Sequence, residues 1–236
     1  MCIDLIILLI VPIIGFAIYI YIKNKYNNQP LKVLLKSFVL GIFTGIFAII
    51  LESLLVKVSL FTGSTQNIYI SFIVASLVEE GTKLAIIFPL IIRSKMFDDK
   101  LDGIMYMIFL GLGFAGIENL VYIVYENIDT VHQVMLLRSI ISVPAHIMFA
   151  IIMGYYISKY KFSSKSKKIE NIILALIVPV LLHGIYDFIL MMSNRWAMII
   201  FVIYMTILMK FSLDIFDKYI KKSKKDFYKG KQDRRN

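Results

Sequence analysis

Ionisable residues inside long apolar stretches are the unusual feature of this sequence. Four successive stretches carry them: Glu79, Glu80 and Lys83 in the first, Glu118 in the second, His146 in the third, and His183 with Asp187 in the fourth. A charged side chain at the centre of a bilayer costs about 2.5–3.5 kcal/mol on insertion scales. We therefore expect these groups to face one another or water.

The spacing of these residues places them on shared helix faces. Lys83 follows Glu79 by four residues and Glu80 by three, and Asp187 follows His183 by four. Residues three or four apart are neighbours on a helix surface. Two adjacent carboxylates repel each other in a low dielectric unless Lys83 or a metal ion offsets their charge. This arrangement suits a general base.

Water is the expected nucleophile. Nothing completes a serine triad around Ser139 or Ser142, and the one cysteine, Cys2, lies far from these stretches. Attack by water needs a base for its proton and groups that polarise the substrate carbonyl. Zinc could supply both, because histidine and carboxylate are its usual ligands, but the HExxH spacing of zinc proteases is absent. The residues alone leave zinc open.

The composition identifies the elements that must hold these groups. Apolar residues make up 59% of the 236 and charged residues 18%, against about 45–50% and about 25% in soluble domains. We therefore predict an all-α polytopic membrane protein. About 20 apolar residues make one span, and seven helices are expected, at 3–22, 34–56, 69–92, 102–125, 139–158, 171–192 and 196–213. Six or eight spans also fit, because only Ser193, Asn194 and Arg195 separate the last two.

The first stretch is expected to be a retained helix, because it lacks the basic start and small-residue cleavage site of a signal peptide. Basic residues indicate the orientation. One set of alternate loops, with the tail, carries 22 of the 26 lysines and arginines, whereas the opposite loops carry Lys57, Arg138 and Arg195. Basic residues remain cytoplasmic, so we predict an outer amino terminus and an inner carboxyl terminus. The net charge of +10 is then mostly at the inner surface.

The basic tail, 214–236, is interpreted as a topology signal with some attraction to anionic lipid heads, and no nucleic-acid partner is expected. The predicted orientation also gives depths. At about 1.5 Å per residue from the outer ends, Glu79 and Glu80 lie about 15 Å deep, Glu118 and His146 about 10 Å, His183 about 13 Å and Asp187 about 8 Å. Four spans thus present polar groups at similar depth, which favours one shared site.

Other polar and small residues are expected to be structural. Two small-residue pairs, Gly41 with Gly45 and Ala150 with Gly154, predict close helix packing. The remaining ionisable loop residues are expected on the solvated surface: Asp98, Asp99, Glu126, Asp129 and His132.

Four ordered motifs resemble a known family. Glu79-Glu80-Gly81-Thr82-Lys83, Phe114-Ala115-Gly116-Ile117-Glu118-Asn119, His146 and His183-Gly184-Ile185-Tyr186-Asp187 closely resemble the PrsW family of intramembrane proteases, over roughly residues 70–190. That family is similar to the type II CAAX prenyl endopeptidases, whose pattern is a glutamate pair followed by arginine, Phe-xxx-His and His-xxx-Asn. This sequence departs from the CAAX pattern at Lys83, Glu118 and Asp187, which disfavours prenylated substrates.

The resemblance implies a single integral-membrane protease domain over 1–236, in a bacterial cytoplasmic membrane. It implies site-1 cleavage of a single-span anti-sigma factor on the extracytoplasmic side, as part of stress signalling. PrsW proteins are usually grouped with metalloproteases, whereas a glutamate base without metal has been argued for the CAAX relatives. No organic cofactor is expected.

Our hypothesis assigns a role to each buried group. Glu79 or Glu80 activates water, with Glu79 slightly favoured, and Lys83 balances the charge of the pair. Glu118, His146 and His183 either bind a metal or orient the water and the oxyanion. Asp187 fixes His183 from one helical turn away.

Three other interpretations remain open at this point. The charges could form a structural ion cluster that specifies packing. A proton- or cation-coupled transporter could use the same groups as an ion relay, and it would show ion flux without peptide cleavage. A seven-helix receptor or scaffold would keep full activity after Glu79→Gln or His183→Ala.

Overall fold

The structure is a computed structural model that describes residues 3–23, 29–192 and 194–233. Within these ranges the regular elements are all helices, so the predicted all-α architecture is confirmed. They are α1 (Ile3–Lys23), α2 (Leu31–Lys57), α3 (Gly63–Tyr69), η1 (Ile70–Leu77), α4 (Val78–Ile92), α5 (Lys100–Tyr125), α6 (Val131–Leu137), η2 (Arg138–Ser142), α7 (Val143–Phe162), α8 (Lys165–Met191) and α9 (Arg195–Asp233). The two η elements are π-helical. Cys2, Ser193 and the last three residues of the basic tail lie outside the described ranges.

Six helical segments in the described residues are long and apolar enough to cross a membrane: α1, α2, α5, the segment from α6 through α7, α8, and the Arg195–Lys229 part of α9. The chain is therefore a multi-pass membrane protein. The segment expected to span at 69–92 is not among the six, because it carries Glu79, Glu80 and Lys83. It is nevertheless helical through α3, η1 and α4. Seven spans and an outer amino terminus stay predictions.

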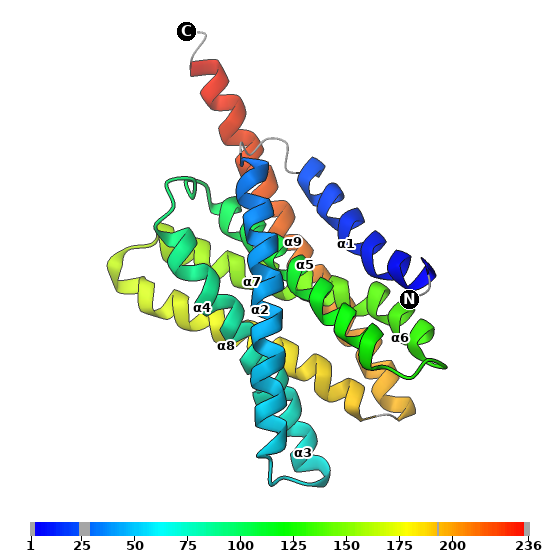
Figure 1. Cartoon of the computed structure of the whole chain (residues 1–236). Helices are drawn as coiled ribbons and strands as arrows, with labels where there is room; N and C mark the ends of the chain where they lie inside the picture. The colour runs from blue at the N-terminus through cyan, green and yellow to red at the C-terminus, as the bar shows by residue number, and fades with distance from the viewer. Residues whose placement is uncertain (1–2, 24–28, 193, 234–236) are drawn as a thin grey trace.

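Helix α5 lies at the centre of the molecule, between α2 and α7 (Figure 1). Every residue from Leu101 to Ala115 is buried. Gly41 of α2 lies directly against the backbone carbonyl of Leu110, and Gly154 of α7 lies against that of Gly103. A side chain at either glycine would separate the helices, so the predicted packing role of these small residues is confirmed.

A capping arrangement fixes the start of α5. The Asp99 carboxylate accepts a hydrogen bond from the Leu101 N–H at 3.0 Å, and Asp102 accepts from the N–H of Asp98 and of Asp99 at 2.9 and 2.7 Å. Such a box satisfies amide groups that the first turn leaves free. Asp99, which was expected in solvated surface, is therefore a structural cap.

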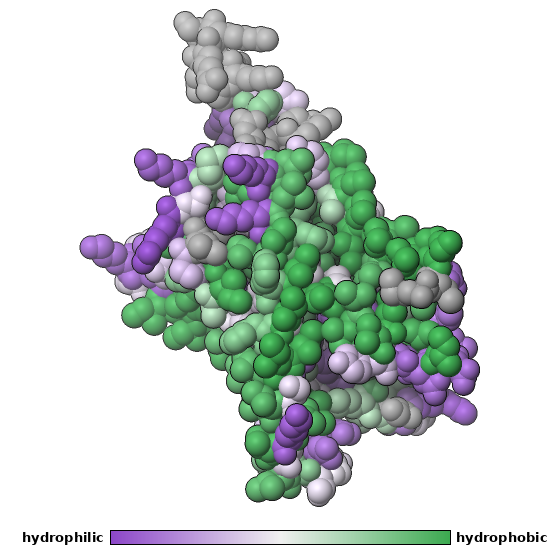
Figure 2. All heavy atoms as spheres, in the orientation of Figure 1, coloured by the Kyte–Doolittle hydropathy of each residue, from purple (hydrophilic) through white to green (hydrophobic). Residues whose placement is uncertain are grey.

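Helix α9 continues well beyond the expected end of the last span at 213. Phe216 and Tyr219 extend its packed face toward α5 and α7, and Lys23 of α1 pairs with Asp217 at 2.7 Å. These contacts hold the first turns of the basic tail against the bundle. In Figure 1 its end projects beyond the other helices. Figure 2 shows a broad apolar surface on the face in view, with hydrophilic side chains gathered on either side of it.

Candidate active site

Four helices bring the predicted residues together. Glu79, Glu80 and Lys83 come from α4, Glu118 from α5, His146 from α7, and His183 with Asp187 from α8. All but Glu118 and Asp187 are at most 5% exposed. The side chains of Glu118 and Asp187 are 17% and 22% exposed. The seven residues form one continuous set of polar contacts, so the expected convergence is what the structure shows.

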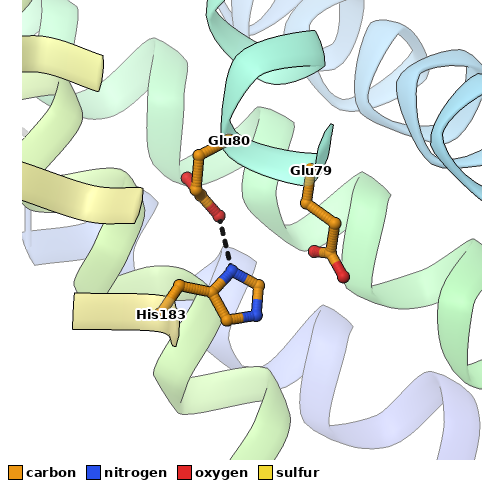
Figure 3. Close-up of side chains that lie close together, drawn as sticks. All are labelled: Glu79, Glu80 and His183. Atoms are coloured by element: carbon orange, nitrogen blue, oxygen red, sulfur yellow. Dashed lines mark hydrogen bonds and ion pairs between the residues drawn. The ribbon is translucent and has the colours of Figure 1, made fainter. Parts of the chain in front are cut away.

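Lys83 and His183 both hold the Glu80 carboxylate. Lys83 Nζ lies 2.7 Å from Glu80 Oε1 and 3.3 Å from Glu79 Oε2. His183 Nδ1 donates to the same Glu80 Oε1 at 3.1 Å, while its Nε2 lies 3.3 Å from Asp187 Oδ2. Figure 3 shows Glu79, Glu80 and His183 directed toward a common space. Asp187 occupies the position that the one-turn spacing predicted.

His146 joins this group to Glu118. Its Nδ1 lies 3.3 Å from Lys83 Nζ, and its Nε2 lies 2.7 Å from Glu118 Oε2. An ammonium group only donates hydrogen bonds, so His146 Nδ1 must accept and Nε2 must carry the proton given to Glu118. The contacts on both sides thus determine the tautomer of this imidazole.

Aromatic rings surround the charged groups. The Phe149 ring stacks on the His183 imidazole with centroids 4.8 Å apart and planes at 18°. Lys83 Nζ lies 3.9 Å from the centroid of the Phe114 ring, within the range of a cation–π contact. These rings exclude water from part of the site and limit the rotation of the imidazole.

A π-helical segment precedes each of two site helices. η1 leads directly into Val78 and the glutamate pair, and η2 leads into α7 four residues before His146. π-helical turns occur mostly as short insertions within α-helices, frequently at functional sites. Pro144, the second residue of α7 and just after η2, has no N–H to donate to the preceding turn. Both irregular segments therefore change the register at which the site residues are presented.

Gly184 allows η1 to approach α8. A Cβ atom at this position would collide with the Phe72 ring. The close approach places Glu80, which follows η1 on α4, against His183, the residue before Gly184. The contact between these two helices is thus part of the site.

Arg138 was wrongly predicted to be an outer loop residue. It is the first residue of η2, and its NH2 atom lies 2.6 Å from Glu118 Oε1. A charged residue at the end of an apolar stretch is normally a loop signal, and the pattern of the sequence gives no sign that it turns back toward a buried glutamate.

The donor set suits a metal ion. Two groups of three have ligand atoms that all lie within 4.8 Å of one another: Glu79, Glu80 and His183, and Glu79, Glu118 and His146. The three ligands expected from the motifs are therefore divided between two groups that share Glu79. Glu80 Oε2 is buried and has no hydrogen-bond partner among the described residues. Imidazole and carboxylate are common zinc ligands, so these residues fit such an ion.

Comparison with known proteins agrees with the motifs. The family described as PrsW family intramembrane metalloprotease matches residues 29–212. The chain is 49% identical to Protease PrsW of Clostridioides difficile (strain 630), over 97% of this chain and 96% of that protein. It is 33% identical to Protease PrsW of Bacillus subtilis (strain 168), over 79% of this chain and 83% of the relative. No solved structure gives a significant match. The chain therefore belongs to the PrsW family and is an intramembrane protease.

Proposed function

We propose that this protease hydrolyses a peptide bond of a single-span membrane protein with water that Glu79 activates. The observation that carries the proposal is the contact of one buried ammonium, Lys83 Nζ, with Glu79, Glu80 and His146. Such a group keeps two neighbouring carboxylates charged in an apolar setting. It also provides a positive charge close to the place where a substrate carbonyl would react.

The contacts favour Glu79 as the base. Glu80 Oε1 already accepts from Lys83 at 2.7 Å and from His183 at 3.1 Å, whereas Glu79 has a 3.3 Å contact with Lys83. Glu79 therefore has more oxygen lone pairs free for a water proton. Glu80 then holds Lys83 and His183 in place.

The remaining residues complete a hydrolysis reaction. Glu79 takes a proton from water, the hydroxide oxygen bonds to the scissile carbonyl carbon, and the carbon–nitrogen bond breaks as Glu79 returns the proton to the leaving amine. The positive charge of Lys83, close to the reacting carbonyl, stabilises the oxyanion, because preorganised charge contributes most where negative charge develops. Asp187 orients His183 by its 3.3 Å contact with Nε2.

We propose zinc as the metal of this chain, with Glu80 and His183 as its ligands and the neighbouring Glu79 left free to take the proton of the water. The free Oε2 atom of Glu80 favours this group, because both oxygens of Glu118 are already engaged by Arg138 and His146. When bound, zinc would polarise the carbonyl and make water a stronger nucleophile. Asp187 beside His183 is the kind of carboxylate that orients a metal-bound histidine.

We further propose that the substrate is an anti-sigma factor cut on the extracytoplasmic side. The support is the motif resemblance, together with the predicted depth of the polar groups in the outer half of the bilayer. A helical substrate must unwind before its peptide bond reaches Glu79. We therefore expect slow turnover.

The test is cleavage of a co-expressed single-span reporter that carries a different tag on each side of the membrane. Wild type should release a product that disappears with Glu79→Gln, Glu80→Gln and His183→Ala. Glu170→Gln is the matched control, since Glu170 is an exposed glutamate on the same helix as His183. Equal product from wild type and all site variants would assign the cleavage to another enzyme and contradict the proposal.

A further inference from the structure

Arg138 contacts three residues within about one turn of α5, Glu118, Asn119 and Tyr122. Its NH2 atom lies 2.6 Å from Glu118 Oε1, and its Nε donates to Asn119 Oδ1 at 2.7 Å. Its guanidinium carbon lies 3.7 Å from the centroid of the Tyr122 ring. The side chain is 14% exposed. A residue that only marks the end of a membrane span would not be expected to make so many buried contacts.

The Glu118 carboxylate is clamped between two residues of the same helical segment. Arg138 Nη2 forms an ion pair with Oε1 at 2.6 Å, and His146 Nε2 lies 2.7 Å from Oε2. The guanidinium is itself held by the hydrogen bond from its Nε to Asn119 Oδ1, so its ion pair restrains the position of the Glu118 carboxylate. Since Glu118 accepts the Nε2 proton of His146, the restraint extends to the imidazole and then to Lys83.

The π-helical turn of η2 explains how one segment reaches both oxygens. Residues 138 and 146 are eight apart, which in a regular α-helix is about 800° of rotation and leaves their side chains about 80° apart. A π turn takes in one more residue, which reduces the offset to about 20°. η2, which covers residues 138–142, lies between them. The irregular turn therefore aligns Arg138 and His146 on the same face, toward α5.

We propose that Arg138 is a positioning residue of the protease, which acts through Glu118 to orient His146 and Lys83. This inference rests on the proposed function, since it assigns Arg138 to the same reaction. Arg138 does not contact the substrate in this role. Loss of Arg138 should therefore lower kcat and leave KM nearly unchanged.

The first test measures cleavage kinetics of purified protein in proteoliposomes with a single-span peptide. Arg138→Ala should lower kcat about 100-fold, the order of effect expected when catalytic groups are misplaced by about 1 Å. Arg138→Lys keeps the positive charge but loses the planar set of guanidinium N–H donors, so its kcat should lie between those of Arg138→Ala and wild type. Added guanidinium ion should raise the kcat of Arg138→Ala and leave Arg138→Lys unchanged. Arg195→Ala, which removes an exposed arginine at the start of α9, is the matched control and should behave as wild type.

The second test measures thermal unfolding of Arg138→Ala, Glu118→Gln and the double variant in detergent. If the clamp exists, the fall in Tm of the double variant is smaller than the sum of the two single falls. Additive falls, or full kcat in a folded Arg138→Ala protein, would overturn the inference alone. A wild-type protein that cleaves nothing would overturn the proposed function, and the inference with it.

Discussion

Lys83 Nζ lies 2.7 Å from Glu80 Oε1, one turn along the same helix, and both side chains are almost completely buried. A buried ion pair is strongly destabilised when one partner is removed, because the remaining charge has no compensation. Here the ammonium compensates two carboxylates at once. Lys83 is thus a structural and a chemical requirement of the site.

Lys83→Met should therefore lose both activity and stability. We expect product formation to fall below detection and the free energy of unfolding to drop by about 3–5 kcal/mol. Reporter cleavage and thermal unfolding in detergent check these two effects. Lys57→Met, at an exposed lysine of α2, should change neither. A Lys83→Met protein that is stable and active would show that the ammonium is dispensable.

Glu79→Gln should separate binding from chemistry. The amide keeps the shape of the side chain but cannot take a proton from water, so kcat should fall about 10²–10⁴-fold while the substrate still binds. Crosslinking of the inactive variant to a single-span peptide measures retained binding. Loss of crosslinking together with kcat would instead indicate that Glu79 holds the substrate.

Gly184→Ala should destabilise the contact between η1 and α8. The added methyl group meets the Phe72 ring, and overpacking of this kind costs about 1–3 kcal/mol. Gly81→Ala is the matched control, because nothing lies within 4 Å of its added Cβ atom. That variant should keep its Tm or gain slightly, since alanine favours helix by about 1 kcal/mol over glycine. Equal Tm values for wild type and Gly184→Ala would contradict the role given to this glycine.

Zinc content should follow His183. Purified wild type is expected to hold a near-stoichiometric amount of zinc, and chelation should lower both activity and Tm, because a ligand that binds only the folded state stabilises it. His183→Ala and Glu80→Gln should lose the metal, whereas Glu170→Gln should keep it. Elemental analysis measures the content. Retention in His183→Ala with loss in His146→Ala would place the ion in the other group, and active protein free of metal would contradict a zinc mechanism.

The convergence of the site could be predicted because charge is costly in an apolar chain. An ionisable side chain in an apolar helix is least costly to bury beside other polar groups. The structure brings together the five that the sequence placed in such helices, Glu79, Glu80, Glu118, His146 and His183. Spacing of three or four residues also gave the pairs Glu80 with Lys83 and His183 with Asp187. These predictions needed only helix geometry and the energy of burial.

Other features left no comparable sign in the sequence. A π-helical turn has no distinctive composition, so the alignment of Arg138 with His146 could not be foreseen. Phe114 and Phe149 touch the charged groups, but 17 phenylalanines in an apolar chain look alike in sequence. The last helix was predicted to end too early, at residue 213, because the many charged residues that follow indicate a solvated segment. The apolar residues on the packed face of this part of α9, which include Phe216, are too few to show it as a helix in the sequence.

The most direct measurement uses purified protein in liposomes with a single-span peptide and reads the products by mass spectrometry in water enriched in oxygen-18. Wild type should give two fragments, with one heavy oxygen in the new carboxyl terminus, and Glu79→Gln should give none. This result would show that the chain itself hydrolyses a membrane-embedded peptide with water from this site. Intact peptide with wild type, or equal cleavage by Glu79→Gln, would contradict the central claim.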